Sequence, residues 1–148
     1  MPSTFLALHY HIVFSTKARA PLIAESWRER LHEYVGGTAA GLGGIPQGAG
    51  GVADHVHLLV GLKATHCLAD FVRDLRKAST VCVRDELQLR GFAWQEGYGA
   101  FTVSPTARPS VQRYIKNQPR HHRVRTFREE LDEFLKEAGV KYEGRFLD

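Results

Sequence analysis

The chain has 148 residues, of which 43% are hydrophobic and 24% charged, a composition typical of one folded domain and unlike that of a disordered chain. No run approaches the roughly 20 apolar residues that a membrane-spanning helix needs, and the first residues lack the pattern of a secretory signal. We therefore expect a cytoplasmic protein without membrane contact and with a single domain over residues 1–148. Its net charge of +4 indicates a polyanionic partner only if the positive charge is concentrated in one part of the chain.

Apolar residues in the first part of the chain repeat with the periods of strands and of one helix. β-rich runs predict strands, and a stretch with apolar residues every three or four positions, stopped by Gly43-Gly44, predicts a helix. The elements expected here are a strand over 5–14, a helix from about 25 to 42, and a hairpin of strands over 45–52 and 55–62.

The remaining chain adds one more strand and three helices. Gly91 is expected to stop the first of these helices, and the Thr126-x-x-Glu129 pattern is a capping box at the start of the last. The elements expected are a helix over 68–90, a strand over 98–104, a helix from 110, and a helix from 126 to 139.

The order β-α-β-β-α-β followed by two helices is that of an α+β, ferredoxin-like (RRM-like) fold. Such a fold has one four-stranded antiparallel sheet with two helices packed on one face. We expect the opposite face to stay free for a functional site.

Two histidines share one face of the strand expected over 55–62. The period of two places His55 and His57 on the side away from the two helices, about 6.5 Å apart along the strand. Two imidazoles at this spacing can bind one divalent ion. An isolated His-x-His is also common as the polar face of a strand, and His9 and His11 have the same spacing.

Positive charge gathers in residues 97–128, which contain seven Lys or Arg residues and no acid. This segment favours a nucleic-acid partner, although a solvated basic face is the alternative. A helix within it places Tyr114 and Gln118 one turn apart on one face, while Pro119 disfavours helical backbone at Gln118. The residues expected to contact phosphate groups are Lys77 on the preceding long helix, Arg113, Lys116, Arg120, Arg123 and Arg125.

Four short motifs are distributed over nearly the whole chain. They are HIVFSTK at 11–17, DHVH at 54–57, YIKNQ at 114–118 with two histidines shortly after it, and GVKY at 139–142. With these motifs the chain resembles the single-tyrosine HUH transposases of small bacterial insertion sequences, including relatives of the REP-associated tyrosine transposases.

This resemblance implies a DNA transposase in which Tyr114 is the nucleophile. The enzyme would cleave and rejoin single-stranded DNA through a covalent 5′-phosphotyrosine, which retains the energy of the cleaved bond so that rejoining needs no ATP. It further implies single-stranded DNA with hairpin ends as the substrate and a homodimer as the active form.

The resemblance also implies a metal site. His55, His57 and Gln118 would bind a divalent cation, Mg²⁺ or Mn²⁺, that stabilises the transition state. We expect His9 and His11 to lie behind these ligands or to face the DNA.

Two other functions are compatible with the same sequence. One is a non-catalytic, RRM-like module that binds single-stranded nucleic acid, although the aromatic pair on which such modules stack bases is absent from the strands. The other is a domesticated tyrosine nickase, which would share every residue named above.

Overall fold

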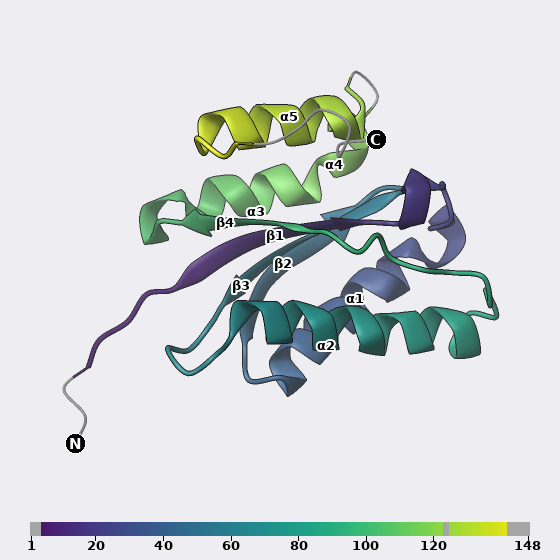
Figure 1. The fold of residues 1–148 in the computed structure, drawn as a ribbon, viewed down its shortest axis with the longest axis horizontal. Helices are drawn as coiled ribbons and strands as arrows, with labels where there is room; N and C mark the ends of the chain where they lie inside the picture. The colour runs from purple at the N-terminus through teal and green to yellow at the C-terminus, as the bar shows by residue number, and fades with distance from the viewer. Residues whose placement is uncertain (1–3, 123–124, 142–148) are drawn as a thin grey trace.

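A computed structural model describes residues 4–122 and 125–141 and contains one four-stranded antiparallel sheet (Figure 1). The strands are β1 (His9–Ser15), β2 (Ile45–Gly51), β3 (His55–Gly61) and β4 (Gly99–Val103). They lie in the order β2-β3-β1-β4, so that β1 and β3 are the central pair. The predicted α+β, ferredoxin-like fold is confirmed.

Helices cover both faces of the sheet: α1 and α2 lie on one face, and α3, α4 and α5 lie on the other (Figure 1). The helices are α1 (Glu25–Gly41), α2 (Leu68–Val81), α3 (Arg108–Lys116), α4 (Gln118–His121) and α5 (Phe127–Glu137), with short turns η1 (Lys17–Arg19), η2 (Cys82–Glu86) and η3 (Pro105–Ala107). The expectation of a free second face is therefore wrong, because the C-terminal helices fold back over it. Within the described residues, no helix has the length and apolar character needed to cross a membrane.

The face of the sheet towards α1 and α2 carries the main hydrophobic core. Val56, Leu58 and Val60 of β3 are fully buried on this side. The helical residues that pack there include Leu31, Val35 and Ala39 of α1 and Phe71, Val72 and Leu75 of α2. Because successive side chains of a strand alternate between faces, this packing turns His55 and His57 towards α3, α4 and α5.

The first strand is shorter than predicted. β1 pairs with both of its neighbours from His9 onward, where His9 lies opposite Gly61 and Val103, the last residues of β3 and β4. Residues before His9 extend past these strand ends, and Phe5 and Leu6 are 91% and 56% exposed. The apolar alternation there predicts a strand, but a strand needs a partner with which to pair.

Two helix boundaries also differ from the predicted ones. α2 ends at Val81 and continues as the π-helical turn η2, and Gln88 adopts a φ of 61°, so helical backbone stops before the predicted end at Arg90. α3 begins at Arg108 instead of Ser110, with a proline in its first turn, where proline is well tolerated.

Gly50 allows α3 to approach β2 closely. A Cβ atom at Gly50 would lie 2.5 Å from the carbonyl oxygen of Ile115 and 2.9 Å from its Cγ2. Gly50→Ala is therefore expected to force α3 away from the sheet and to lower the free energy of unfolding by about 1–3 kcal/mol, measured by urea denaturation. Gly48→Ala is the matched control, because its Cβ would meet only Gln112 Cγ at 3.9 Å. Equal stability of the two variants would contradict the role of Gly50.

Candidate active site

β3 presents two buried histidines to the layer of C-terminal helices. His55 and His57 are fully buried, with ring centroids 5.0 Å apart. Nδ1 of His55 lies 2.7 Å from Oδ1 of Asp54, and a hydrogen bond of 2.7 Å joins Nδ1 of His57 to Nε2 of His11. With both Nδ1 atoms held in this way, both Nε2 atoms are directed towards the C-terminal helices.

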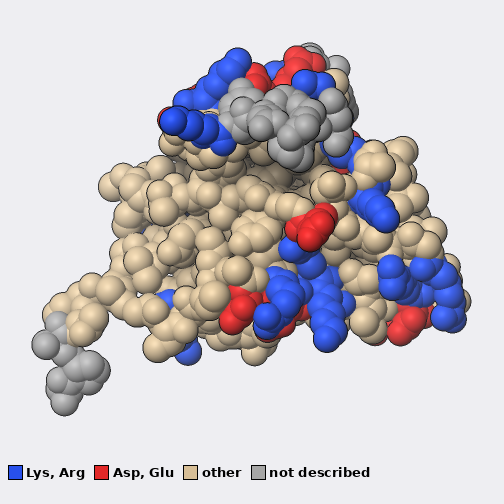
Figure 2. Space-filling model, viewed as in Figure 1, with Lys and Arg blue, Asp and Glu red and all other residues tan. Residues whose placement is uncertain are grey.

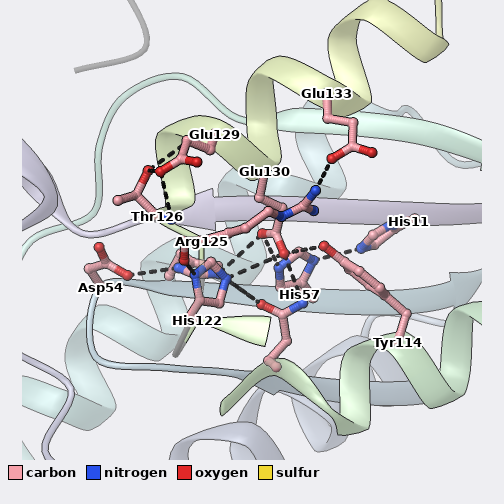
Figure 3. Close-up of polar contacts among 12 residues, drawn as sticks. His11, Asp54, His57, Tyr114, His122, Arg125, Thr126, Glu129, Glu130 and Glu133 are labelled. Atoms are coloured by element: carbon pink, nitrogen blue, oxygen red, sulfur yellow. Dashed lines mark hydrogen bonds and ion pairs between the residues drawn. The ribbon is translucent and has the colours of Figure 1, made fainter. Parts of the chain in front are cut away.

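α3 and α4 bring a phenol and an amide to these histidines. The hydroxyl of Tyr114, on α3, donates a hydrogen bond to the carboxylate of Glu130 on α5 (Figure 3). Gln118 is fully buried, and its Oε1 lies 3.0 Å from Nε2 of His55. Pro119 does not prevent this contact, because α3 and α4 are separate helices and Pro119 lies in the first turn of α4.

Glu130 is the residue on which the cluster converges. It is 1% exposed, and its Oε1 lies 3.0 Å from Nε2 of His57 and 3.4 Å from Nε2 of His55. Its Oε2 accepts hydrogen bonds from the Tyr114 hydroxyl and, at 3.0 Å, from Nε2 of Gln118. One carboxylate thus connects the phenol, the amide and both histidines.

His122 lies at the edge of the same cluster. Its Nε2 is 3.0 Å from Oε1 of Gln118 and 3.3 Å from Oε2 of Glu130, and its Nδ1 donates to the carbonyl oxygen of Arg125 at 2.8 Å. Ligand atoms of His55, His122 and Glu130 all lie within 4.8 Å of one another. The arrangement therefore offers imidazole, carboxylate and amide atoms that can hold a metal ion.

Sequence reasoning did not find Glu130 and left the role of His122 open. A signal for Glu130 exists in α5, where it lies within the apolar stripe of Phe127, Leu131 and Phe134. A carboxylate at a position suited to a buried residue indicates a specific partner, because charged groups are rarely buried unpaired.

The histidines differ in the direction of their pKa shifts. Burial lowers the pKa of His57 to about 4, and burial together with His57 lowers that of His11 to about 3. The pKa of His55 is raised, because its hydrogen bonds to Asp54 and Glu130 outweigh the effect of burial. His57 and His11 are therefore neutral at pH 7, and neutral imidazole is the form that binds metal ions.

The nucleophile candidate and its partner have opposite pKa shifts. Burial and the hydrogen bond to Glu130 raise the pKa of Tyr114. Burial alone would raise the pKa of Glu130, but hydrogen bonds from His122, His55 and His57 outweigh it and hold that pKa well below its usual range. In this state the phenol is protonated and the carboxylate is charged.

The other predicted residues lie outside the cluster. His9 is on the same face of β1 as His11, but its Nδ1 has no hydrogen-bond partner among the described residues. Lys77 lies on α2, across the sheet from the histidines, where basic side chains gather at the lower edge of Figure 2. The remaining predicted phosphate contacts are Arg113, Lys116 and Arg120, which are exposed on α3 and α4, Arg125, which pairs with Glu133, and Arg123, which lies outside the described residues.

Comparison with known proteins agrees with this architecture. The ISDra2 transposase TnpA of Deinococcus radiodurans is 29% identical over 119 residues, which cover 75% of this chain and 84% of the relative. A crystal structure of a Deinococcus radiodurans R1 protein classed as a transposase superposes with a TM-score of 0.64 at 27% identity, covering 80% of this chain and 95% of that one. The fold is also shared with a REP-associated tyrosine transposase bound to a REP hairpin, with a TM-score of 0.59 at 11% identity, covering 82% and 73% of the two chains.

The family assignment comes from the sequence model of the IS200-like transposases, which matches residues 4–118. This range contains the whole sheet, the two buried histidines of β3 and the tyrosine helix. The chain belongs to the IS200-like transposase family.

Proposed function

We propose that this transposase cleaves and rejoins single-stranded DNA through a covalent 5′-phosphotyrosine on Tyr114, beside a divalent metal ion bound by His55, His57 and Gln118. The observation that carries the proposal is a convergence within one subunit. The hydroxyl of Tyr114 and Nε2 of both histidines contact the same carboxylate, that of Glu130. A nucleophile next to metal-binding imidazoles is the arrangement that metal-assisted attack on a phosphodiester requires.

The donor atoms suit a divalent ion. Nε2 of His55 and Oε1 of Gln118 are 3.0 Å apart, and Asp54 and His11 hold the opposite nitrogens of the two β3 rings, as outer groups do behind metal-binding histidines. Mn²⁺ accepts mixed nitrogen and oxygen ligands, and Mg²⁺ does so when water and phosphate supply further oxygens. A bound ion would neutralise charge that develops on the phosphate oxygens.

The tyrosine chemistry balances without another co-reactant. The Tyr114 oxygen bonds to phosphorus while the bond from phosphorus to the 3′ oxygen breaks. Solvent takes up the phenolic proton and supplies a proton to the 3′ oxygen, so the step balances. Because the pKa of Tyr114 is raised, the proton has to leave during attack instead of beforehand. The 5′-phosphotyrosine conserves the bond energy for rejoining.

The DNA would run along the outer side of the tyrosine helix. Arg113, Lys116 and Arg120 are exposed on α3 and α4, next to Tyr114, where they can contact successive phosphate groups. The structural relative bound to a REP hairpin supports a hairpin substrate. Tyr114 packs against His57 of its own subunit, with ring centroids 5.8 Å apart, so the proposed chemistry can run in cis. The homodimer stays a prediction.

The structure disfavours a purely RNA-recognition type of binding. Modules of that type stack bases on an open sheet face. Here α3, α4 and α5 cover that face, and His55 and His57 are fully buried beneath them. A base could not stack on these strands unless the C-terminal helices moved away.

The direct test is a covalent-adduct assay. The protein is incubated with single-stranded oligonucleotides that tile both DNA flanks of its gene, and the products are separated on a denaturing gel. With Mn²⁺ or Mg²⁺, at least one oligonucleotide is expected to remain attached to the protein, and EDTA is expected to abolish the adduct. Tight binding of the oligonucleotides without any adduct would instead support a non-catalytic nucleic-acid binder.

A further inference from the structure

The C-terminal helices contribute to the site although they lie beyond residues 4–118, the part that the family model matches. From α5, Glu130 places its carboxylate between the histidines of β3 and Tyr114 of α3 (Figure 3). We propose that Glu130 is itself a ligand of the metal ion, so that in this protein α5 completes the metal site from within the same subunit. This inference rests on the proposed function.

The spacing of the donor atoms supports a common ion. Ligand atoms that each lie about 2.1 Å from one ion are about 3.0 Å apart when neighbouring in an octahedron and about 3.4 Å apart in a tetrahedron. Oε1 of Glu130 lies 3.0 Å from Nε2 of His57 and 3.4 Å from Nε2 of His55. Oε1 of Gln118 lies 3.0 Å from Nε2 of His55. Each of these separations therefore lies in the range expected for neighbouring ligands of one ion.

The two oxygens of Glu130 have different partners. Oε1 faces the two β3 histidines, while Oε2 accepts hydrogen bonds from Tyr114 and Gln118. Binding of an ion through Oε1 therefore leaves the contacts of Oε2 in place. A single carboxylate can in this way hold both the ion and the hydroxyl of the nucleophile, which fixes one relative to the other.

A metal cation would also stabilise the buried charge of Glu130. The carboxylate is 1% exposed, and in the described part of the chain its ion pairs are all with histidines. Taking an anion out of water is costly unless it is paired. A divalent ion would supply the positive charge that pairs with the carboxylate. A carboxylate oxygen is also a ligand that Mg²⁺ and Mn²⁺ prefer over imidazole.

The position of Glu130 is fixed by the start of α5. Thr126 and Glu129 form the predicted capping box, in which the Thr126 hydroxyl accepts from Glu129 N at 3.2 Å. In the first turn, Phe127 is buried and stacks on the ring of His55 with centroids 4.1 Å apart. These contacts hold the first turn of α5 against β3, and they thereby fix the position of the Glu130 carboxylate.

The test compares Mn²⁺ affinity, measured by calorimetry, in the wild type and Glu130→Gln. Loss of an anionic ligand is expected to weaken Mn²⁺ binding by about tenfold or more and to change the visible absorption of bound Co²⁺, which reports the ligand set. Glu133→Gln is the matched control, because Glu133 is exposed on the same helix and forms a surface ion pair with Arg125. It is expected to bind Mn²⁺ as the wild type does.

Unchanged Mn²⁺ affinity in Glu130→Gln would overturn the inference, and tighter binding would show that the carboxylate blocks the site instead of completing it. If Glu130→Gln does not fold, Glu130→Asp replaces it, since it keeps the charge but withdraws the oxygens by one carbon–carbon bond. Unchanged Mn²⁺ affinity in Glu130→Asp would likewise overturn the inference. Failure of the wild type itself to bind Mn²⁺ and form an adduct would instead refute the proposed function.

Discussion

Tyr114→Phe is expected to abolish the covalent DNA adduct, by at least about a thousandfold, while the protein stays folded and still binds DNA. The substitution removes only the phenolic oxygen, which is the proposed attacking atom. The ring contacts, such as those with His121 at 4.6 Å and Phe134 at 5.5 Å between centroids, remain available. The carboxylate of Glu130 loses one hydrogen bond but keeps that from Gln118, so stability should fall by only about 1 kcal/mol.

The matched control is Tyr34→Phe. Tyr34 lies on α1, on the opposite side of the sheet from the site, and loses the same single oxygen. The adduct is measured with a labelled oligonucleotide on a denaturing gel, DNA affinity by fluorescence anisotropy, and folding by thermal denaturation. An adduct that persists in Tyr114→Phe would assign the nucleophile to another residue, whereas loss in both variants would point to damage of the fold.

The faces of the central strands could be predicted from the sequence because they depend on local geometry. The direction of a side chain in a strand is set by the period of two. The apolar run Val56, Leu58 and Val60 therefore sufficed to place His55 and His57 together on the other face. The same local rule found the capping box of α5, since a cap involves residues only three positions apart.

The docking of the C-terminal helices could not be predicted in this way. Glu130 and His57 are 73 positions apart in the chain, and their contact exists only because α3, α4 and α5 fold over the sheet. The apolar stripe of α5 shows that one helix face is buried but not against which element it packs. Tertiary packing thus supplied the residue on which the whole cluster converges.

The absence of strand structure at Phe5 and Leu6, before β1, has a related cause. The alternation at Phe5 and Leu6 has the period of a strand, but pairing depends on where the neighbouring strands end. A sequence pattern shows that a segment can form a strand, but the segment forms one only where a neighbouring strand is available to pair with it. The two histidines of β1 also differ in their contacts: Nε2 of His11 contacts His57, whereas Nδ1 of His9 has no hydrogen-bond partner among the described residues.

His57→Ala is expected to weaken Mn²⁺ binding by about a hundredfold and to prevent adduct formation. Nε2 of His57 is 3.0 Å from Glu130, and its Nδ1 is held by His11, so the substitution removes a donor that is already oriented. It also leaves the buried Oε1 of Glu130 with one partner fewer, which should lower the free energy of unfolding by about 1–3 kcal/mol. Calorimetry gives the affinity, and urea denaturation gives the stability.

His9→Ala is the control for His57→Ala. It shows whether the loss of Mn²⁺ affinity is specific to the proposed ligand or follows from removing any histidine on this face of the sheet. His9 belongs to the strand next to β3 and shares the sheet face of His11, yet its Nδ1 makes no hydrogen bond within the described residues. The variant should keep wild-type Mn²⁺ affinity. If His57→Ala retained that affinity, His57 could not be a ligand. If both variants lost it equally, the effect would belong to the sheet, because of these two histidines it is His57 that directs a nitrogen at the carboxylate to which the Tyr114 hydroxyl is hydrogen-bonded.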